Sequence, residues 1–201
     1  MFLMAIRRYS AVFILPLFFL FSLICTPLFS QASKYRITEI SGDVFCQRDD
    51  KTEKLASDYL ECSSTIKILT GSNSQVYFSN DTGIEVKVKD NSSIILSAPG
   101  ELFIDFGIVG VRARPGLNLL KDSSFSIATK HLKTMLKEGI IAVKTDKILT
   151  QLAVLKGWTL VATKNNEHSL LKQKEEIAAG EYELSQKYAS TDELFYAFYW
   201  K

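Results

Sequence analysis

The sequence predicts an all-β fold of short, mainly antiparallel strands, arranged either as a two-sheet sandwich or as a curled, β-helix-like domain. Two observations favour this class. Apolar and polar residues alternate in many short runs, and a period of two is typical of strands with one buried face. Glycine repeatedly precedes such a run, at Gly42, Gly83, Gly139, Gly157 and Gly180. We interpret these glycines as turn positions, and their uneven spacing does not indicate a solenoid repeat of fixed period.

The clearest strand lies within residues 83–89, where Ile84, Val86 and Val88 share one face. Residues 74–79 alternate in the same way. The segment between these two strands contains Asn, Asp and Gly, which tolerate positive φ, so we expect a hairpin. Further strands are expected near residues 94–96, 102–104, 125–128, 141–143, 152–154 and 160–162.

Two segments depart from this pattern. Leu132, Met135 and Leu136 have helical spacing, so a short helix within residues 131–138 is an alternative to a strand there. Near the C-terminus, Ser190 and Glu193 resemble a capping box, and we expect a short helix in the tail, residues 186–201. This helix would be apolar almost all round, so it must dock on the domain's own sheet, on a partner or on a membrane surface.

The N-terminal residues 1–32 have the layout of a secretory signal peptide. Arg7 and Arg8 precede a long apolar segment, and the small residues Ser30 and Ala32 precede the expected cleavage point. An uncleaved membrane anchor over residues 11–29 and lipidation at Cys25 are the alternatives. We therefore expect a periplasmic or otherwise exported protein, with a β domain over residues 33–185.

Charge and cysteine content restrict the partners. The chain carries 24 Lys and Arg against 22 Asp and Glu, and the two arginines of the leader account for the difference. No basic surplus remains for nucleic acid binding. Cys46 and Cys62 follow the leader and would form a disulfide in an oxidising compartment, worth about 3 kcal/mol in the chain-entropy estimate. Two free, buried thiols are the alternative.

Several motifs, taken in order, resemble the FecR domain. An opening strand is expected at residues 40–44. It is followed by a strand that leads into Thr70 and Gly71, small polar residues, and a new strand at Val76. Further matching segments lie at residues 125–129, 154–161 and 179–182. The likeness covers residues 37–184. It implies an all-β periplasmic module, which in the founding members relays occupancy of an outer-membrane iron-siderophore receptor to a cytoplasmic sigma factor. Only residues 1–9 precede the apolar segment here, so we expect no cytoplasmic sigma-regulating segment and do not carry over the iron-signalling role.

The sequence contains little that predicts catalysis. His131 and His168 are far apart in polar stretches, and we expect both to be exposed. Neither has a nearby Cys or a paired His in the spacing that a catalytic triad or metal site needs. We therefore predict no enzyme activity, no metal and no cofactor. A hydrolase with an unrecognised site would need a pocket in which a histidine meets a serine or a carboxylate at hydrogen-bond distance.

The predicted function is that of an exported envelope protein acting as a binding or scaffold module through contacts with an envelope or membrane protein. A periplasmic protein that binds a small ligand or cell-wall glycan is one alternative, and a signalling component related to sigma-factor regulation is another. Arg112 and Arg114 share one strand face and would bind carboxylates of a partner, or of this chain itself. The remaining candidate binding residues are Trp158, Phe195, Tyr199 and Trp200.

Overall fold

The computed structural model describes residues 33–55, 59–62, 65–97, 100–115, 125–163, 165–181, 184–185 and 188–189. By their contacts, residues Gln31–Lys201 group as one unit, apart from Met1–Ser30. The predicted leader lies outside the described residues. Of the predicted C-terminal helix only residues 188–189 are described, and they form a strand, so the helix is not supported. Within the described part of the chain, no helix is long and apolar enough to cross a membrane.

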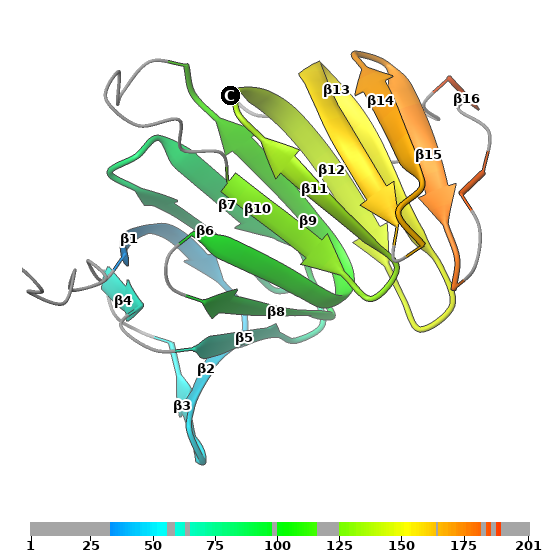
Figure 1. Ribbon diagram of the computed structural model, residues 1–201. Coiled ribbons are helices and arrows are strands. Elements are labelled where there is room, and N and C mark those ends of the chain that lie inside the picture. Colours follow the sequence, from blue (N-terminus) through cyan, green and yellow to red (C-terminus); the bar gives the residue numbers. More distant parts are fainter. Residues whose placement is uncertain are drawn as a thin grey trace, which may run out of the picture. The chain divides into compact units, whose positions relative to one another are not determined.

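The regular secondary structure of the described residues consists of β-strands, which confirms the predicted class (Figure 1). In chain order the strands are β1 (Ser33–Ser41), β2 (Val44–Arg48), β3 (Lys51–Lys54), β4 (Tyr59–Cys62), β5 (Ile66–Thr70), β6 (Gln75–Asn80), β7 (Ile84–Val88), β8 (Ser92–Ser97), β9 (Glu101–Ala113), β10 (Phe125–Thr129), β11 (Leu132–Leu136), β12 (Gly139–Thr145), β13 (Thr150–Thr163), β14 (His168–Lys172), β15 (Glu175–Ala179) and β16 (Tyr188–Ala189).

The strands form two sheets, which we call sheet A and sheet B. Sheet A has the order β4-β1-β6-β7-β9-β12-β13-β15-β16. Sheet B has the order β3-β2-β5-β8-β9-β10-β11-β13-β14. Neighbouring strands are antiparallel except β9 and β10, which are parallel. The mainly antiparallel pairing therefore agrees with the prediction.

The two long strands, β9 and β13, belong to both sheets. The first half of β9 pairs in sheet B, and the half that begins at Gly107 pairs with β7 and β12 in sheet A. In β13 the part up to Gly157 pairs in sheet A, and the part from Trp158 pairs in sheet B. Gly107 and Gly157 have φ of 106° and 86°, values that side-chain-bearing residues rarely adopt. The interpretation of Gly157 as a turn residue is therefore wrong, because it lies inside a strand where the chain changes sheets.

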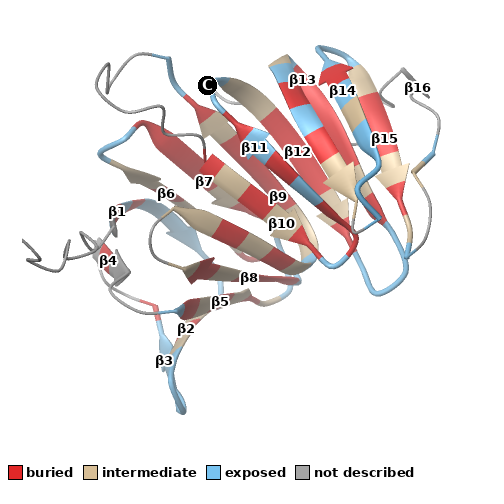
Figure 2. Cartoon of the chain, in the orientation of Figure 1, coloured by how far each residue is buried: buried red, intermediate tan, exposed pale blue. Residues whose placement is uncertain are grey.

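The hydrophobic core consists of the inner faces of both sheets, whose buried side chains form one contiguous cluster. In β5, for example, Ile66 and Ile68 are fully buried, while Lys67 and Leu69 are only partly buried. Figure 2 shows this alternation of burial along many of the strands. Such burial of every second residue is the physical source of the period-two pattern in the sequence.

The predicted hairpin is confirmed by β6 and β7, which pair in antiparallel register. The carboxamide oxygen of Asn80 accepts hydrogen bonds from the backbone N–H groups of Thr82 (3.1 Å) and Ile84 (2.9 Å). Gly83 has a φ of 82°, so the turn uses the conformational freedom that its glycine provides.

The alternative of a short helix within residues 131–138 is wrong, because Leu132–Leu136 is strand β11. Leu132, Thr134 and Leu136 are buried, whereas Lys133 and Met135 are exposed. The helical spacing of Met135 was misleading, since this residue points away from the core. Pairing of β11 with β10 and β13 on its two sides outweighs the local pattern.

Cys46 lies in β2 as a buried, free cysteine. Burial raises the pKa of its thiol, an effect that the nearby Arg48 opposes. The predicted Cys46–Cys62 disulfide is therefore not formed in this structure, and the alternative of a free, buried thiol holds for Cys46; the side chain of Cys62 lies outside the described residues.

The crossing point in β9 provides a stability test. A Cβ added to Gly107 would lie 2.6 Å from the backbone Cα of Ser92, and the φ of 106° adds conformational strain. We expect Gly107→Ala to lower the free energy of unfolding by about 3 kcal/mol, since overpacking and an unfavourable φ each cost about 1–3 kcal/mol. Urea unfolding followed by circular dichroism measures this loss.

The matched control is Gly100→Ala. Gly100 also has positive φ, at 79°, but the nearest atom to its added Cβ would be 3.9 Å away. This variant therefore retains the strain without the clash, and we expect about 1–2 kcal/mol of destabilisation. Equal losses for the two variants would contradict the role assigned to the close approach at Gly107.

Candidate functional site

A buried carboxylate organises the end of sheet A where the two predicted arginines lie. Glu85 on β7 stands opposite Arg112 on β9, and its side chain is only 5% exposed. Arg112 Nη1 donates to Glu85 Oε2 at 3.2 Å, and Arg114 Nη2 forms an ion pair with Oε1. The hydroxyl of Tyr77 on β6 donates to Oε2 at 2.6 Å. Both arginines therefore bind a carboxylate of this chain, which was the alternative left open by the sequence.

These contacts follow from strand alternation. Residues such as Val86 and Val111 point into the core, so their neighbours Glu85 and Arg112 project from the outer face of sheet A. Arg114 follows the end of β9, and its backbone N–H donates to the carbonyl of Gly83 at 3.0 Å. A buried carboxylate is costly unless it is paired, so Glu85 depends on these donors. The Arg114 side chain remains 57% exposed and retains surface for other contacts.

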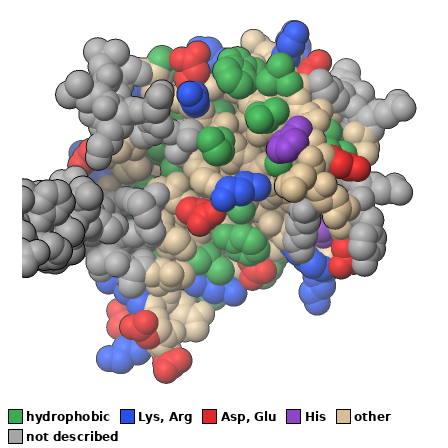
Figure 3. Space-filling model, viewed as in Figure 1, with side chains coloured by type: hydrophobic (Ala, Val, Ile, Leu, Met, Phe, Trp, Pro, Cys, Tyr) green, Lys and Arg blue, Asp and Glu red, His purple; other side chains and the backbone are tan. Residues whose placement is uncertain are grey.

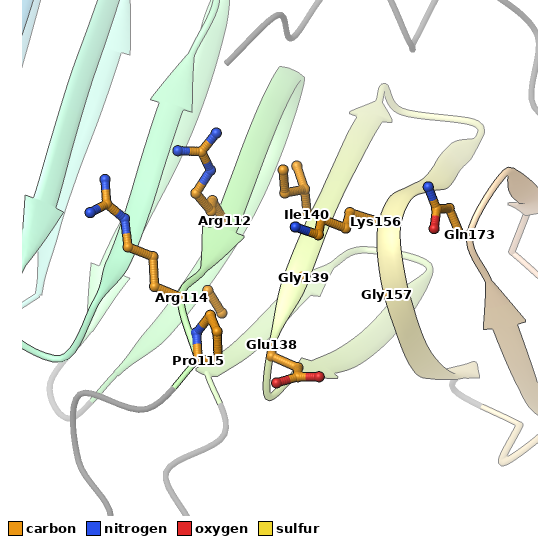
Figure 4. Close-up of a pocket in the computed structure, with 10 residues that line it drawn as sticks. Arg112, Arg114, Pro115, Glu138, Gly139, Ile140, Lys156, Gly157 and Gln173 are labelled. Carbon is orange, nitrogen blue, oxygen red and sulfur yellow. The ribbon is translucent and has the colours of Figure 1, made fainter. Parts of the chain in front are cut away.

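A hollow of about 520 Å³ opens beside the arginines. Figure 4 shows Arg112 and Arg114 extending the same way from the end of β9, with Lys156 of β13 reaching towards Ile140 of β12. Pro115, Glu138 and Gln173 complete the rim. The wall keeps a small positive excess, because Arg112, Arg114 and Lys156 stand against the carboxylates of Glu85 and Glu138.

A second hollow, of about 510 Å³, adjoins the first. It is lined by Trp158, Leu170 and Lys172, and it shares Gly157 and Gln173 with the first hollow. We call the two hollows together the groove. One end of the groove is basic and the other is aromatic and aliphatic.

Gly157 lines both hollows, and its strand neighbour Gly139 lines the first. Gly139 on β12 pairs with Gly157 on β13. A Cβ on Gly139 would lie 2.3 Å from the carbonyl oxygen of Lys156, and one on Gly157 would lie 3.1 Å from that of Glu138. Neither position has room for a side chain, because an added Cβ would meet the backbone of the neighbouring strand.

The apolar end of the groove continues onto the outer face of sheet B. Met135, Leu160 and Leu170 lie side by side across β11, β13 and β14, and all three are exposed. Trp158, two residues before Leu160 on β13, is 51% exposed. Figure 3 shows hydrophobic side chains gathered over this part of the surface. A cluster of exposed large apolar side chains is typical of a contact surface.

The structure thus brings three of the predicted residues, Arg112, Arg114 and Trp158, to one groove. Phe195, Tyr199 and Trp200 lie outside the described residues. Sequence reasoning did not identify Glu85, Lys156 or Leu170 as part of a site. Glu85 and Lys156 alternate with apolar residues like many solvated strand positions, so no local signal distinguished them.

The expectation of two exposed histidines is wrong for His131, which is 2% exposed. Its Nδ1 lies 3.0 Å from Thr150 Oγ1, and that hydroxyl also bonds Thr129 and Thr145. The local polar sequence was misleading, because the polar neighbours form this buried hydroxyl cluster. Neither His131 nor Thr150 lines the groove. Among the described residues, no group of three or more His, Cys, Asp or Glu could hold a metal ion.

Comparisons with known proteins show a similarity in fold. No family model matches the sequence, and no curated protein is similar to it. Two crystal structures of a proposed anti-sigma factor from Parabacteroides distasonis ATCC 8503, at 2.50 and 1.65 Å resolution, match with TM-scores of 0.54 and 0.53. Each match has 13% sequence identity and covers 62% and 61% of this chain. It spans 60% and 59% of the two matched chains, so this chain corresponds to about three fifths of each.

The environment of Tyr77 predicts a pH dependence. Burial, the hydrogen bond to Glu85 and the charge of Glu85 raise the pKa of Tyr77 well above its usual value of 10.0, while Arg112 and Arg114 oppose the shift. The folded state therefore holds this proton more tightly than the unfolded state does. The resulting stability is present below pH 10 and is lost as the pH rises above it. We expect the free energy of unfolding of Tyr77→Phe to fall less steeply above pH 10 than that of the unsubstituted protein.

Urea unfolding at pH 8, 10 and 11 measures this difference in slope. Tyr77→Phe also loses its hydrogen bond to Glu85, so it should be less stable at pH 8, by about 1 kcal/mol. Parallel pH profiles for the two proteins would show that Glu85 does not hold the Tyr77 proton.

Proposed function

We propose that this chain is an exported, non-enzymatic binding module of the cell envelope, which binds a protein partner through the groove. The observation that carries the proposal is that the two hollows adjoin, since both are lined by Gly157 and Gln173. This arrangement places a basic wall next to exposed aromatic and aliphatic side chains. Export is supported by the signal-peptide layout of residues 1–32.

The comparisons support a regulatory role for the module. The matched structures are those of a proposed anti-sigma factor, and the sequence motifs resemble the FecR domain. We therefore propose that the partner belongs to an envelope signalling system related to sigma-factor regulation. A shared fold alone hosts many functions, so the proposal depends on the groove rather than on the likeness.

The chemistry of the groove predicts the kind of segment it binds. Trp158 and Leu170 would cover an apolar side chain, and the exposed surfaces of Arg114 and Lys156 would bind a carboxylate nearby. Arginine pairs with carboxylates in bidentate geometry, and tryptophan is enriched among residues that dominate binding energy. A partner segment with an acidic residue close to a large apolar residue fits both ends.

The experiment is photo-crosslinking in intact cells, with a photoreactive amino acid in place of the exposed Lys172 at the groove. We expect one partner adduct, and we expect Trp158→Ala to reduce its yield about tenfold, as the loss of about 1.4 kcal/mol of binding energy implies. Lys156→Glu should also weaken the adduct, because it places a negative charge on the basic wall.

Two control variants separate the groove from the general surface. Phe106→Ala removes an exposed aromatic side chain from β9, and Lys147→Glu reverses an exposed charge in the turn between β12 and β13; neither residue lines the groove. Both should leave the adduct unchanged. If only the uncrosslinked protein were recovered, or if Phe106→Ala reduced the adduct as much as Trp158→Ala, the proposal would be wrong.

A second candidate function is binding of a cell-wall glycan. It is favoured by the hollow beside Trp158, since an exposed indole next to polar side chains suits stacking against a sugar ring. If this candidate is right, purified peptidoglycan should sediment the protein, and Trp158→Ala should abolish sedimentation while Phe106→Ala does not. Equal sedimentation of all three proteins would exclude the groove as a glycan site.

A further inference from the structure

The outer face of sheet A contains an apolar floor that is completely covered. Ala142 on β12 pairs with Ala153 on β13, and both residues are 0% exposed. Together with Leu155 they form a hydrophobic cluster separate from the main core, against which Ile108 and Ile140 pack. The alternate residues Ile141, Val143, Leu152 and Val154 belong to the core, so this cluster lies on the opposite face of the sheet.

The covered region extends across the strands of sheet A, along one row of residues that pair with one another. Gly110 lies opposite Ala142, and Glu176 of β15 lies opposite Ala153. Glu176 is also 0% exposed, although an outward-facing glutamate on an uncovered sheet would be in contact with water. The described strands all belong to the two sheets, so none of them crosses over this row.

We propose that the C-terminal segment of this chain, residues 190–201, docks on the floor formed by Gly110, Ala142 and Ala153. The last described strand, β16, pairs with β15 at the edge of sheet A, and Tyr188 lies opposite Glu176. The chain therefore leaves sheet A at the end of the covered row. Twelve residues remain after Ala189.

The length of this segment is sufficient. The path from β16 to β12 crosses three strand spacings, which is about 14 Å at about 4.8 Å per spacing. Twelve residues span about 18 Å as a helix and about 40 Å when extended. Either conformation reaches Ala142.

The composition of the segment also fits. It contains Leu194, Phe195, Tyr196, Phe198, Tyr199 and Trp200, which is a high density of large apolar side chains. Gly110, Ala142 and Ala153 present small or absent side chains, bordered by the larger Ile108, Ile140 and Leu155. Large side chains packed on a floor of small ones give close packing without voids. Docking also removes an otherwise exposed aromatic patch from water.

Fluorescence of Trp200 tests the proposal directly. The chain has two tryptophans, so Trp158→Phe leaves Trp200 as the sole tryptophan. In the purified Trp158→Phe protein we expect a blue-shifted emission and acrylamide quenching several-fold weaker than that of N-acetyltryptophanamide. Adding Ala153→Lys should move a charged side chain into the floor, shift the emission to the red and raise the quenching several-fold.

Ala128→Lys is the matched control, because Ala128 lies on β10 in sheet B and faces away from the core. It should leave the Trp200 signal unchanged. A chain that ends at Ala189 provides a second measurement if Ala153→Lys does not fold: it should keep its β-type circular dichroism and bind the dye ANS more strongly than the complete chain does.

The outcomes that overturn the proposal are distinct. Trp200 quenched as strongly as N-acetyltryptophanamide when the floor is intact would show that the segment is not docked. Protection of Trp200 that appears only at concentrations where ultracentrifugation detects dimers would assign the floor to a second copy. Unchanged ANS binding after removal of residues 190–201 would show that another segment covers the floor formed by Gly110, Ala142 and Ala153.

Discussion

The positive φ of Gly107 and Gly157 is the constraint on which the rest of the structure depends. Each glycine lies where a long strand passes from one sheet to the other, so the two sheets share β9 and β13. A residue with a side chain would strain the backbone at either point and, at Gly107, would also collide with Ser92. Because both sheets pack on one core, the geometry of these two crossings fixes how the inner faces meet.

The candidate site is a consequence of the same crossing in β13. Gly157 pairs with Gly139, and Gly157 lines both hollows. Residues just before the crossing, such as Lys156, project beside the arginines of sheet A, whereas Trp158 projects with Leu160 from sheet B. A basic wall and an apolar wall are therefore adjacent because one strand contributes to both sheets. The bonds from Arg112 and Arg114 to Glu85 fix the position of the basic wall.

Local patterns in the sequence predicted the strands but not the way they are joined. The alternation of Ile84, Val86 and Val88 indicates a strand with one buried face, and the whole pattern lies within the five residues of β7. The strand β11 was ambiguous, because Met135 gives a helical spacing that only pairing with β10 and β13 overrides. Gly157 was predicted to be a turn residue, but its position inside a strand depends on partners in two sheets. The placement of Arg112 and Trp158 in adjoining hollows likewise depends on β12 lying between β9 and β13, an order that no local run of residues encodes.

Ile140 links the groove to the floor of sheet A. Its side chain lines the hollow beside Arg112 and also packs against the cluster of Ala142, Ala153 and Leu155. A segment docked on that cluster would therefore border the basic end of the groove. Any partner that needs Ile140 to move would also alter the packing of the segment, and by linkage the docked segment would alter the affinity for that partner. The two proposals consequently concern neighbouring surfaces that share a side chain, so binding at the groove and docking of residues 190–201 are expected to be coupled.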